Sequence, residues 1–263
     1  MNTKQLALIK KDVRSITSNK QMLTVMMVVP LALSIIVPTI FVLVATLIPE
    51  AENQLQALLK MMAVTVQDGN QSQVLVQLLL NKIMPAFFLI IPIMASSVMA
   101  ASSFVGEKEK HTLETLLYSP LSLKQLFQSK ILAGFSVGMM VSFISFFAMM
   151  IVLEVETLIL TGSAIMPDII SWIIVMFLIA PAISLVAIGI TVRSSAKAQT
   201  VEDAQQRAAF LVFPILALIV CQFTGVIMLN AWILLVIGIV LAVIAVLLTK
   251  NSVGKFSYEK LLK

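Results

Sequence analysis

Six apolar runs free of charged residues dominate the chain, and shorter polar segments separate them. A helix needs about 20 apolar residues to cross a bilayer, and every run is about that long or longer. The last two come from one charge-free stretch that suits two spans joined by a turn at Gly225 or Asn230. The pattern predicts an all-α polytopic membrane protein with a single domain over 1–263. The expected spans are about 22–48, 83–105, 131–153, 169–192, 208–228 and 231–249.

Two further segments lie outside the spans. Residues 3–20 carry apolar side chains at helical spacing, with basic residues largely on the other faces, which predicts an interfacial amphipathic helix at the N-terminus. Its apolar positions are Leu6, Ile9, Val13 and Ile16. Residues 49–82 mix charges and glutamines with Leu and Met, and Asp68-Gly69-Asn70 is a turn signal. We expect 49–82 to be a soluble or surface-lying outer segment.

Composition and charge place these elements in a membrane. Apolar residues make up 60% of the chain, charged residues 12%, and the mean hydropathy is +1.05, so lipid must be the solvent for most of it. Of the 18 basic residues, all but Lys60 and Lys82 fall on the side of the N-terminus. The positive-inside rule therefore predicts a cell-membrane protein with both termini and the loops 106–130 and 193–207 in the cytoplasm. This distribution explains the net charge of +5 without nucleic acid as a partner.

Side chains within the runs argue against chemistry there. The serines of the second run, Ser96, Ser97, Ser102 and Ser103, have no histidine in any run to activate them, which makes a membrane-embedded enzyme the less favoured alternative. We expect these serines, and Gly134 with Gly138, to serve close helix packing. Trp172 and Trp232 fall near the expected outer ends of spans, where aromatic anchors belong.

Ligands and ion pathways are equally scarce. One cysteine, Cys221, and one histidine, His111, exclude an internal disulfide and leave too few ligands for a metal site. No run contains Asp, Glu, Lys, Arg or His, which disfavours an ion-coupled secondary transporter. That alternative stays open because unwound helices can bind Na⁺ through carbonyls.

The most charged part of the chain is the loop from Gly106 to Lys130. Residues 107–118 suit a helix with i,i+4 charge pairs and an apolar stripe, and Ser119-Pro120 ends it. Ser122 and Gln125 have the spacing of a capping box that starts the next helix. The sequence predicts a helical cytoplasmic hairpin; spacing alone leaves open whether it docks a partner or only keeps the loop soluble.

This loop resembles the first cytoplasmic loop of ABC-2 type transporter permeases, where a G-E-x-E-x-x-T-x-E-x-L-L-x-x-P run precedes a lysine at the start of the third helix. The matching positions are Gly106, Glu107, Glu109, Thr112, Glu114, Leu116, Leu117, Pro120 and Lys130. Loop 193–207 is similar to the family's second cytoplasmic loop, which also leads into a span containing a proline, here Pro214.

The resemblance implies a transmembrane permease subunit of an ATP-driven exporter. Two permease chains, identical or different, would stand on two cytoplasmic ABC ATPase subunits that bind ATP and Mg²⁺. The chain itself has no GxxxxGK[ST] phosphate loop, so we expect it to be no enzyme and to bind no cofactor directly. On the resemblance, the residues that contact the ATPase are Glu107, Glu109, Leu113, Glu114 and Leu117. No large outer domain is evident, which favours export; the residues leave the substrate open.

Overall fold

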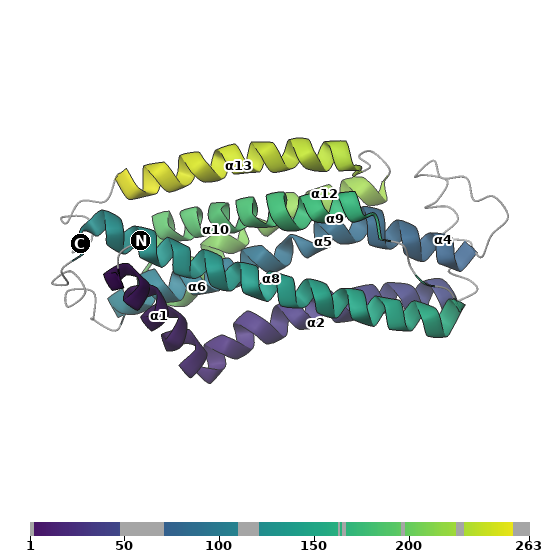
Figure 1. Ribbon diagram of the computed structural model, residues 1–263, viewed down its shortest axis with the longest axis horizontal. Coiled ribbons are helices and arrows are strands. Elements are labelled where there is room, and N and C mark those ends of the chain that lie inside the picture. Colours follow the sequence, from purple (N-terminus) through teal and green to yellow (C-terminus); the bar gives the residue numbers. More distant parts are fainter. Residues whose placement is uncertain are drawn as a thin grey trace.

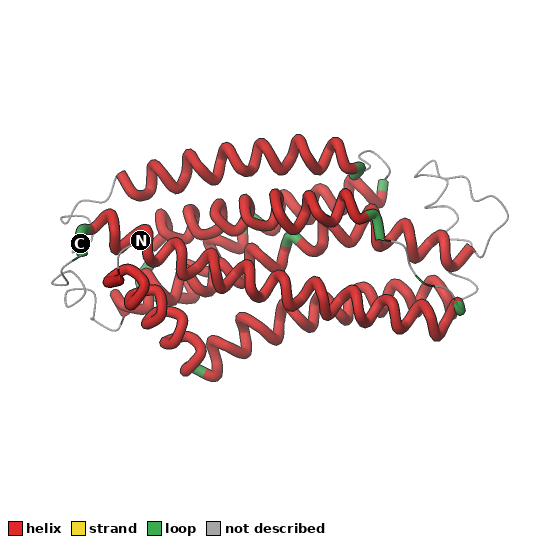
Figure 2. Tube along the Cα trace, in the orientation of Figure 1, coloured by secondary structure: helices red, strands yellow, loops and turns green. Residues whose placement is uncertain are grey.

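The computed structural model describes residues 3–47, 71–109, 121–162, 164, 167–195, 198–224 and 229–254, and everything below concerns these ranges. Their regular structure is entirely helical. The helices lie side by side along the long axis of the molecule (Figures 1 and 2). The α-helices are α1 (Thr3–Ser18), α2 (Lys20–Leu47), α4 (Gln71–Leu78), α5 (Met84–Phe88), α6 (Ile90–Glu109), α8 (Leu123–Thr161), α9 (Ile169–Ile174), α10 (Ala180–Ser195), α11 (Val201–Ala209), α12 (Val212–Phe223) and α13 (Ala231–Gly254). Two π-helical segments are η1 (Leu79–Ile83) and η2 (Val175–Ile179).

Six stretches of helix in the described ranges are long and apolar enough to cross a membrane, which confirms the predicted all-α class with six helices able to span. They are Met22–Val44, Val76–Glu109, Lys124–Thr161, Ile169–Ser195, Val201–Phe223 and Ala231–Lys250.

Several helices extend beyond the apolar runs. Residues 71–82, which we assigned to the outer segment, form α4 and η1 and lead into the second span, whereas 48–70 lie outside the described residues. Helix α8 continues to Thr161 and so includes Glu154 and Glu156. The backbone hydrogen bonds of a helix do not depend on apolar side chains. A helix can therefore continue past the end of an apolar run. The expected absence of charge holds for the runs but not for the helices, since Lys82 also lies in η1.

The fifth span is broken rather than continuous. Helices α11 and α12 meet at Phe210 and Leu211, and α12 itself has 12 residues. The turn predicted at Asn230 is confirmed at the start of α13, where the Ile233 N–H donates to Asn230 Oδ1 at 3.0 Å. The other candidate, Gly225, lies outside the described residues.

Helix α6 is the centre of the bundle, because 15 of its 20 residues are buried. It packs on α8 through the small residues that the sequence singled out. A Cβ built on Gly138 would lie 2.0 Å from Ser96 Oγ and 3.3 Å from Ser96 Cα, so only glycine permits this approach of α6 and α8. A Cβ on Gly134 would meet Ile188 of α10 at 3.3 Å. The predicted packing roles of Ser96, Gly134 and Gly138 are confirmed.

The two tryptophans have different environments. Trp232 is 78% exposed, as an aromatic anchor requires. Trp172 is only 3% exposed and packs edge-on against Phe88 of α5, with ring centroids 5.8 Å apart. Its assignment to the membrane interface was wrong, because α9 turns this side chain inward onto α5 and α8.

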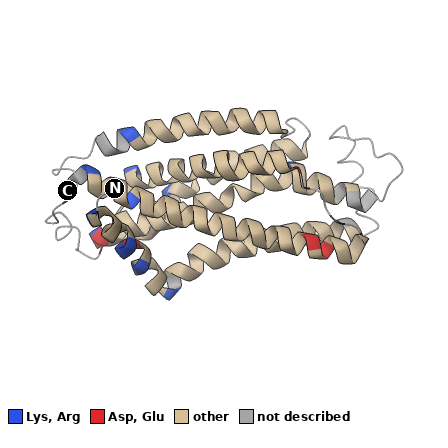
Figure 3. Ribbon diagram, viewed as in Figure 1, with Lys and Arg blue, Asp and Glu red and all other residues tan. Residues whose placement is uncertain are grey.

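Charge is distributed unevenly along the long axis. Lys and Arg gather at the end of the molecule that holds α1 and the end of α13, which we call the basic end (Figure 3). The middle of the bundle is almost free of charge in the same view. The basic residues that the sequence places on one side of the spans therefore lie together at one end of the structure.

Candidate coupling site at the basic end

The face of helix α1 that lies against the bundle carries both apolar side chains and a carboxylate. Leu8, Asp12 and Ile16 are spaced by one turn each and all three are buried. Leu8 joins an apolar cluster with Phe104 of α6 and Phe127 of α8. A helix is present as predicted, over Thr3–Ser18; the residues that it buries are Leu8, Asp12 and Ile16, whereas Leu6, on the face expected to contact the membrane, is 55% exposed.

Lys130 of α8 is the centre of a buried group of charges and has 1% of its side chain exposed. Its Nζ donates to the backbone oxygen of Ser103 and, at 2.9 Å, to Glu107 Oε2. Asp12 Oδ2 lies 4.0 Å away. The ammonium group also lies 5.3 Å from the centre of the Phe104 ring, within range of a cation–π contact.

Two further contacts connect the other members of this group. Glu107 Oε1 pairs with Lys11 Nζ at 2.7 Å, and Ser103 Oγ donates to Asp12 Oδ2 at 2.7 Å. Lys11, Asp12, Ser103, Glu107 and Lys130 thus form one charge cluster, which joins α1, α6 and α8.

The charge cluster is balanced, with two carboxylates and two ammonium groups. Balance matters because an unpaired buried charge costs several kcal/mol, whereas hydrogen-bonded pairs recover much of that cost. Burial raises the pKa of Asp12, and the charge of Lys130 and the hydrogen bond from Ser103 oppose that rise. Removing one charged group would therefore leave another buried without its partner.

Of the five predicted ATPase-contact residues, two lie within the described part of the chain. Glu107 belongs to the charge cluster, and 11% of its side chain is exposed. Glu109 is exposed at the end of α6, where its Oε2 accepts the Val201 N–H of α11 at 3.4 Å. Leu113, Glu114 and Leu117 lie outside the described residues. Glu107 and Glu109 thus connect the end of α6, where the hairpin begins, to α1, α8 and α11.

The far side of the hairpin begins as predicted. Ser122 Oγ accepts the Gln125 N–H at 3.3 Å, and Gln125 Oε1 accepts the Ser122 N–H at 3.1 Å, which confirms the capping box. Helix α8 then runs for 39 residues without a break. At 1.5 Å per residue this is roughly 58 Å, more than the thickness of a bilayer.

Sequence reasoning missed Lys11, Asp12 and Ser103 as members of a site. One signal was present: Asp12 lies four residues from both Leu8 and Ile16, so it interrupts an apolar face with a carboxylate. An acid on the inner face of a helix needs a hydrogen-bond donor or a basic group as its partner. The described residues contain no group of three or more His, Cys, Asp or Glu that could hold a metal.

Comparison of the sequence with known proteins and protein families identifies the family of the chain. No curated protein matches the chain. The model of one family, described as ABC-2 family transporter protein, matches residues 64–201. This range runs from before α4 to the start of α11 and includes the whole of the 106–130 hairpin. Since the match covers more than half of the chain, the protein belongs to the ABC-2 family of transporters.

Proposed function

We propose that this multi-pass membrane protein is the permease subunit of an ATP-driven exporter, and that a separate cytoplasmic ABC ATPase docks on residues 106–130. Family membership supports a role in transport. The chain has no GxxxxGK[ST] phosphate loop, so in an ATP-driven exporter another polypeptide would bind the ATP. A second permease chain, identical or different, would complete the membrane part.

The basic end would face the cytoplasm of the cell. The gathering of Lys and Arg at that end supports this orientation, because basic residues near the ends of spans are retained inside. Both termini and the hairpin would then lie on the side where ATP is available.

The charge cluster is the observation that carries the proposal. It includes both ends of the 106–130 hairpin, with Glu107 near its start on α6 and Lys130 at its end on α8. Because α1, α6 and α8 are joined there, a displacement of the hairpin would move all three helices together. The unbroken α8 would carry that displacement across the membrane.

The test reverses a charge in the proposed docking segment. In Glu114→Arg, we expect the ATPase to co-purify poorly and export from energised vesicles to fall by at least tenfold. The matched control is Lys4→Glu, an exposed charge reversal on α1 at the same end. Unchanged co-purification and export with Glu114→Arg would refute docking at this segment.

An ion-coupled secondary transporter stays as a second candidate, because Lys82, Glu154 and Glu156 lie within helices that are long enough to span the membrane. Intramembrane ionisable groups are common in ion pathways. Transport measured in ATP-depleted vesicles under imposed proton or sodium gradients separates the two. The ATP-driven proposal predicts no transport there.

A further inference from the structure

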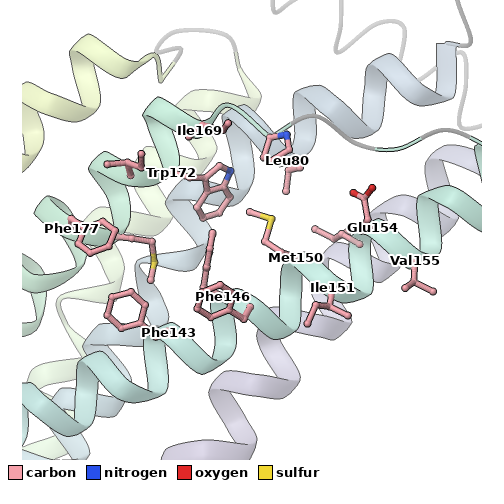
Figure 4. A pocket seen from close by; sticks show the side chains of 15 residues that line it. Leu80, Phe143, Phe146, Met150, Ile151, Glu154, Val155, Ile169, Trp172 and Phe177 are labelled. Carbon is pink, nitrogen blue, oxygen red and sulfur yellow. The ribbon is translucent and has the colours of Figure 1, made fainter.

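A cavity of about 630 Å³ lies between α8 and the α9–η2 segment, well away from the charge cluster. Glu154 at its edge comes 24 residues after Lys130 on α8, roughly 36 Å along the helix. Figure 4 shows Phe146 and Met150 of α8 facing Trp172 of α9 across this space. The cavity is thus in the half of the bundle opposite the basic end.

Aromatic rings supply much of the wall. Phe143 of α8 and Phe177 of η2 approach with centroids 5.8 Å apart, and Phe146 lies 5.2 Å from Trp172. Phe147 adds a further ring beside Phe146. Ring faces of this kind attract cations as well as apolar groups.

Two polar groups in this apolar wall have no partner among the described residues. The Glu154 carboxylate is half-buried, and no hydrogen bond or ion pair of the structure involves it. The buried Nε1 of Trp172 has no acceptor. Leaving a carboxylate unpaired in an apolar setting costs free energy, which pairing with a bound cation would recover.

The backbone around the cavity is also unusual. Both π-helical segments of the described chain border it: η1 contributes Leu80, and η2 contributes Met176 and Phe177. Single π-helical turns inside α-helices occur frequently at functional sites. This observation is independent of the side-chain chemistry.

The cavity opens sideways, toward the lipid. Phe147, Ile173 and Phe177 line it and are 60%, 52% and 68% exposed, and all lie in candidate spans. A ligand that enters there must first dissolve in the bilayer, which excludes inorganic ions and strongly hydrated solutes. A carboxylate and several aromatic rings then favour a positive charge over a neutral or negative one.

We propose that this cavity binds a lipophilic organic cation, whose charge is shielded by aryl or alkyl groups and pairs with Glu154. The site is separate from the hairpin, and binding requires neither ATP nor the ATPase. Whether a bound cation is then exported rests on the proposed function.

The experiment measures binding to the purified full-length protein in lipid nanodiscs, without ATPase or nucleotide. The probe is tetraphenylphosphonium, and its anionic isostere tetraphenylborate has nearly the same shape. In a Trp232→Phe background, the fluorescence of Trp172 reports occupancy of the cavity. We expect saturable quenching by the cation and little by the anion.

Two isosteric variants complete the test. Glu154→Gln should weaken binding of tetraphenylphosphonium by roughly tenfold, because the paired charge is lost. Glu156→Gln is the matched control, since Glu156 accepts the Thr39 hydroxyl at 2.6 Å toward α2, and it should leave binding unchanged. Equal binding of both probes, or no effect of Glu154→Gln, would overturn the proposal and leave only an apolar cavity filled by lipid. Neither result bears on whether an ATPase docks at 106–130.

Discussion

Lys130 and Glu107 form an ion pair of 2.9 Å across α8 and α6, with 1% of the lysine side chain exposed. The two residues lie near the start and at the end of the 106–130 hairpin that we propose to receive the ATPase, 23 positions apart in the sequence. The pair therefore fixes the base of the hairpin to the membrane helices.

The first prediction concerns the charge of Lys130. Lys130→Met keeps most of the length of the side chain but leaves Glu107 and Asp12 buried with too little positive charge. Removing one partner of a buried pair typically costs about 3–5 kcal/mol. We expect a clear fall in the melting temperature in detergent. Adding Glu107→Gln to Lys130→Met should restore part of the loss. A melting temperature equal to that of the wild type would show that the pair does not hold these helices.

The second prediction concerns pH. Burial raises the pKa of Asp12, so the folded protein holds the proton more tightly than the unfolded chain does. Ionising Asp12 therefore costs stability, and this cost is absent below the ordinary carboxyl range and grows as the pH rises through the raised pKa. Asp12→Asn cannot ionise and so escapes that cost.

The measurement is the difference in melting temperature between Asp12→Asn and the wild type, taken from about pH 4 to about pH 8. The subtraction removes the effect of titrating groups that do not interact with Asp12. The wild type should lose stability relative to the variant as the pH rises. A difference that stays constant, or that changes in the opposite direction, would contradict the assigned shift.

The third prediction concerns the contact between α6 and α8. A methyl group at Gly138 would lie 2.0 Å from Ser96 Oγ, so Gly138→Ala should separate the helices and cost about 1–3 kcal/mol. Ser96→Gly in the same chain should recover much of this cost. Gly106→Ala is the control, because its new methyl group would lie 3.6 Å from Val201, an ordinary contact. Equal stability of the two alanine variants would exclude a tight approach at Gly138.

The fourth prediction concerns the start of α8. Ser122→Ala removes the acceptor for the Gln125 N–H and should cost about 1 kcal/mol, as is usual for an N-cap. Ser122→Asp keeps an acceptor and should stay close to the wild type. Hydrogen exchange at the first turn of α8 is the direct measurement, and equal exchange in Ser122→Ala and the wild type would show that the cap does not matter.

Much of the fold could be predicted from the sequence, because a bilayer demands long apolar helices and the chain shows them as uninterrupted runs. The ends of those helices could not. Residues 71–82 and 154–161 are polar enough to be taken for connections, yet hydrogen bonding along the backbone continues through them. A polar side chain at a helix end is tolerated when it finds a partner or reaches water.

The candidate site, too, could be predicted from the sequence only in part. The capping box at Ser122 and the tight packing at Gly138 are local patterns, and both are confirmed. The charge cluster depends on contacts between α1, α6 and α8, such as the one between Asp12 and Ser103, which are far apart in sequence. No local pattern records which basic group meets a buried acid, so these partners emerged only from the packing of the three helices. Trp172 was misassigned for the same reason.

Site-specific photocrosslinking from the hairpin is the most direct test of the central claim, that an ATPase acts on this chain through residues 106–130. A photoreactive amino acid placed at Glu109 or at Glu114 in intact membranes should yield a crosslink to a cytoplasmic ATPase, whereas one at Trp232, exposed at the start of α13, should not. If neither hairpin position reaches an ATPase, or if both are labelled from outside the cell, the claim is wrong.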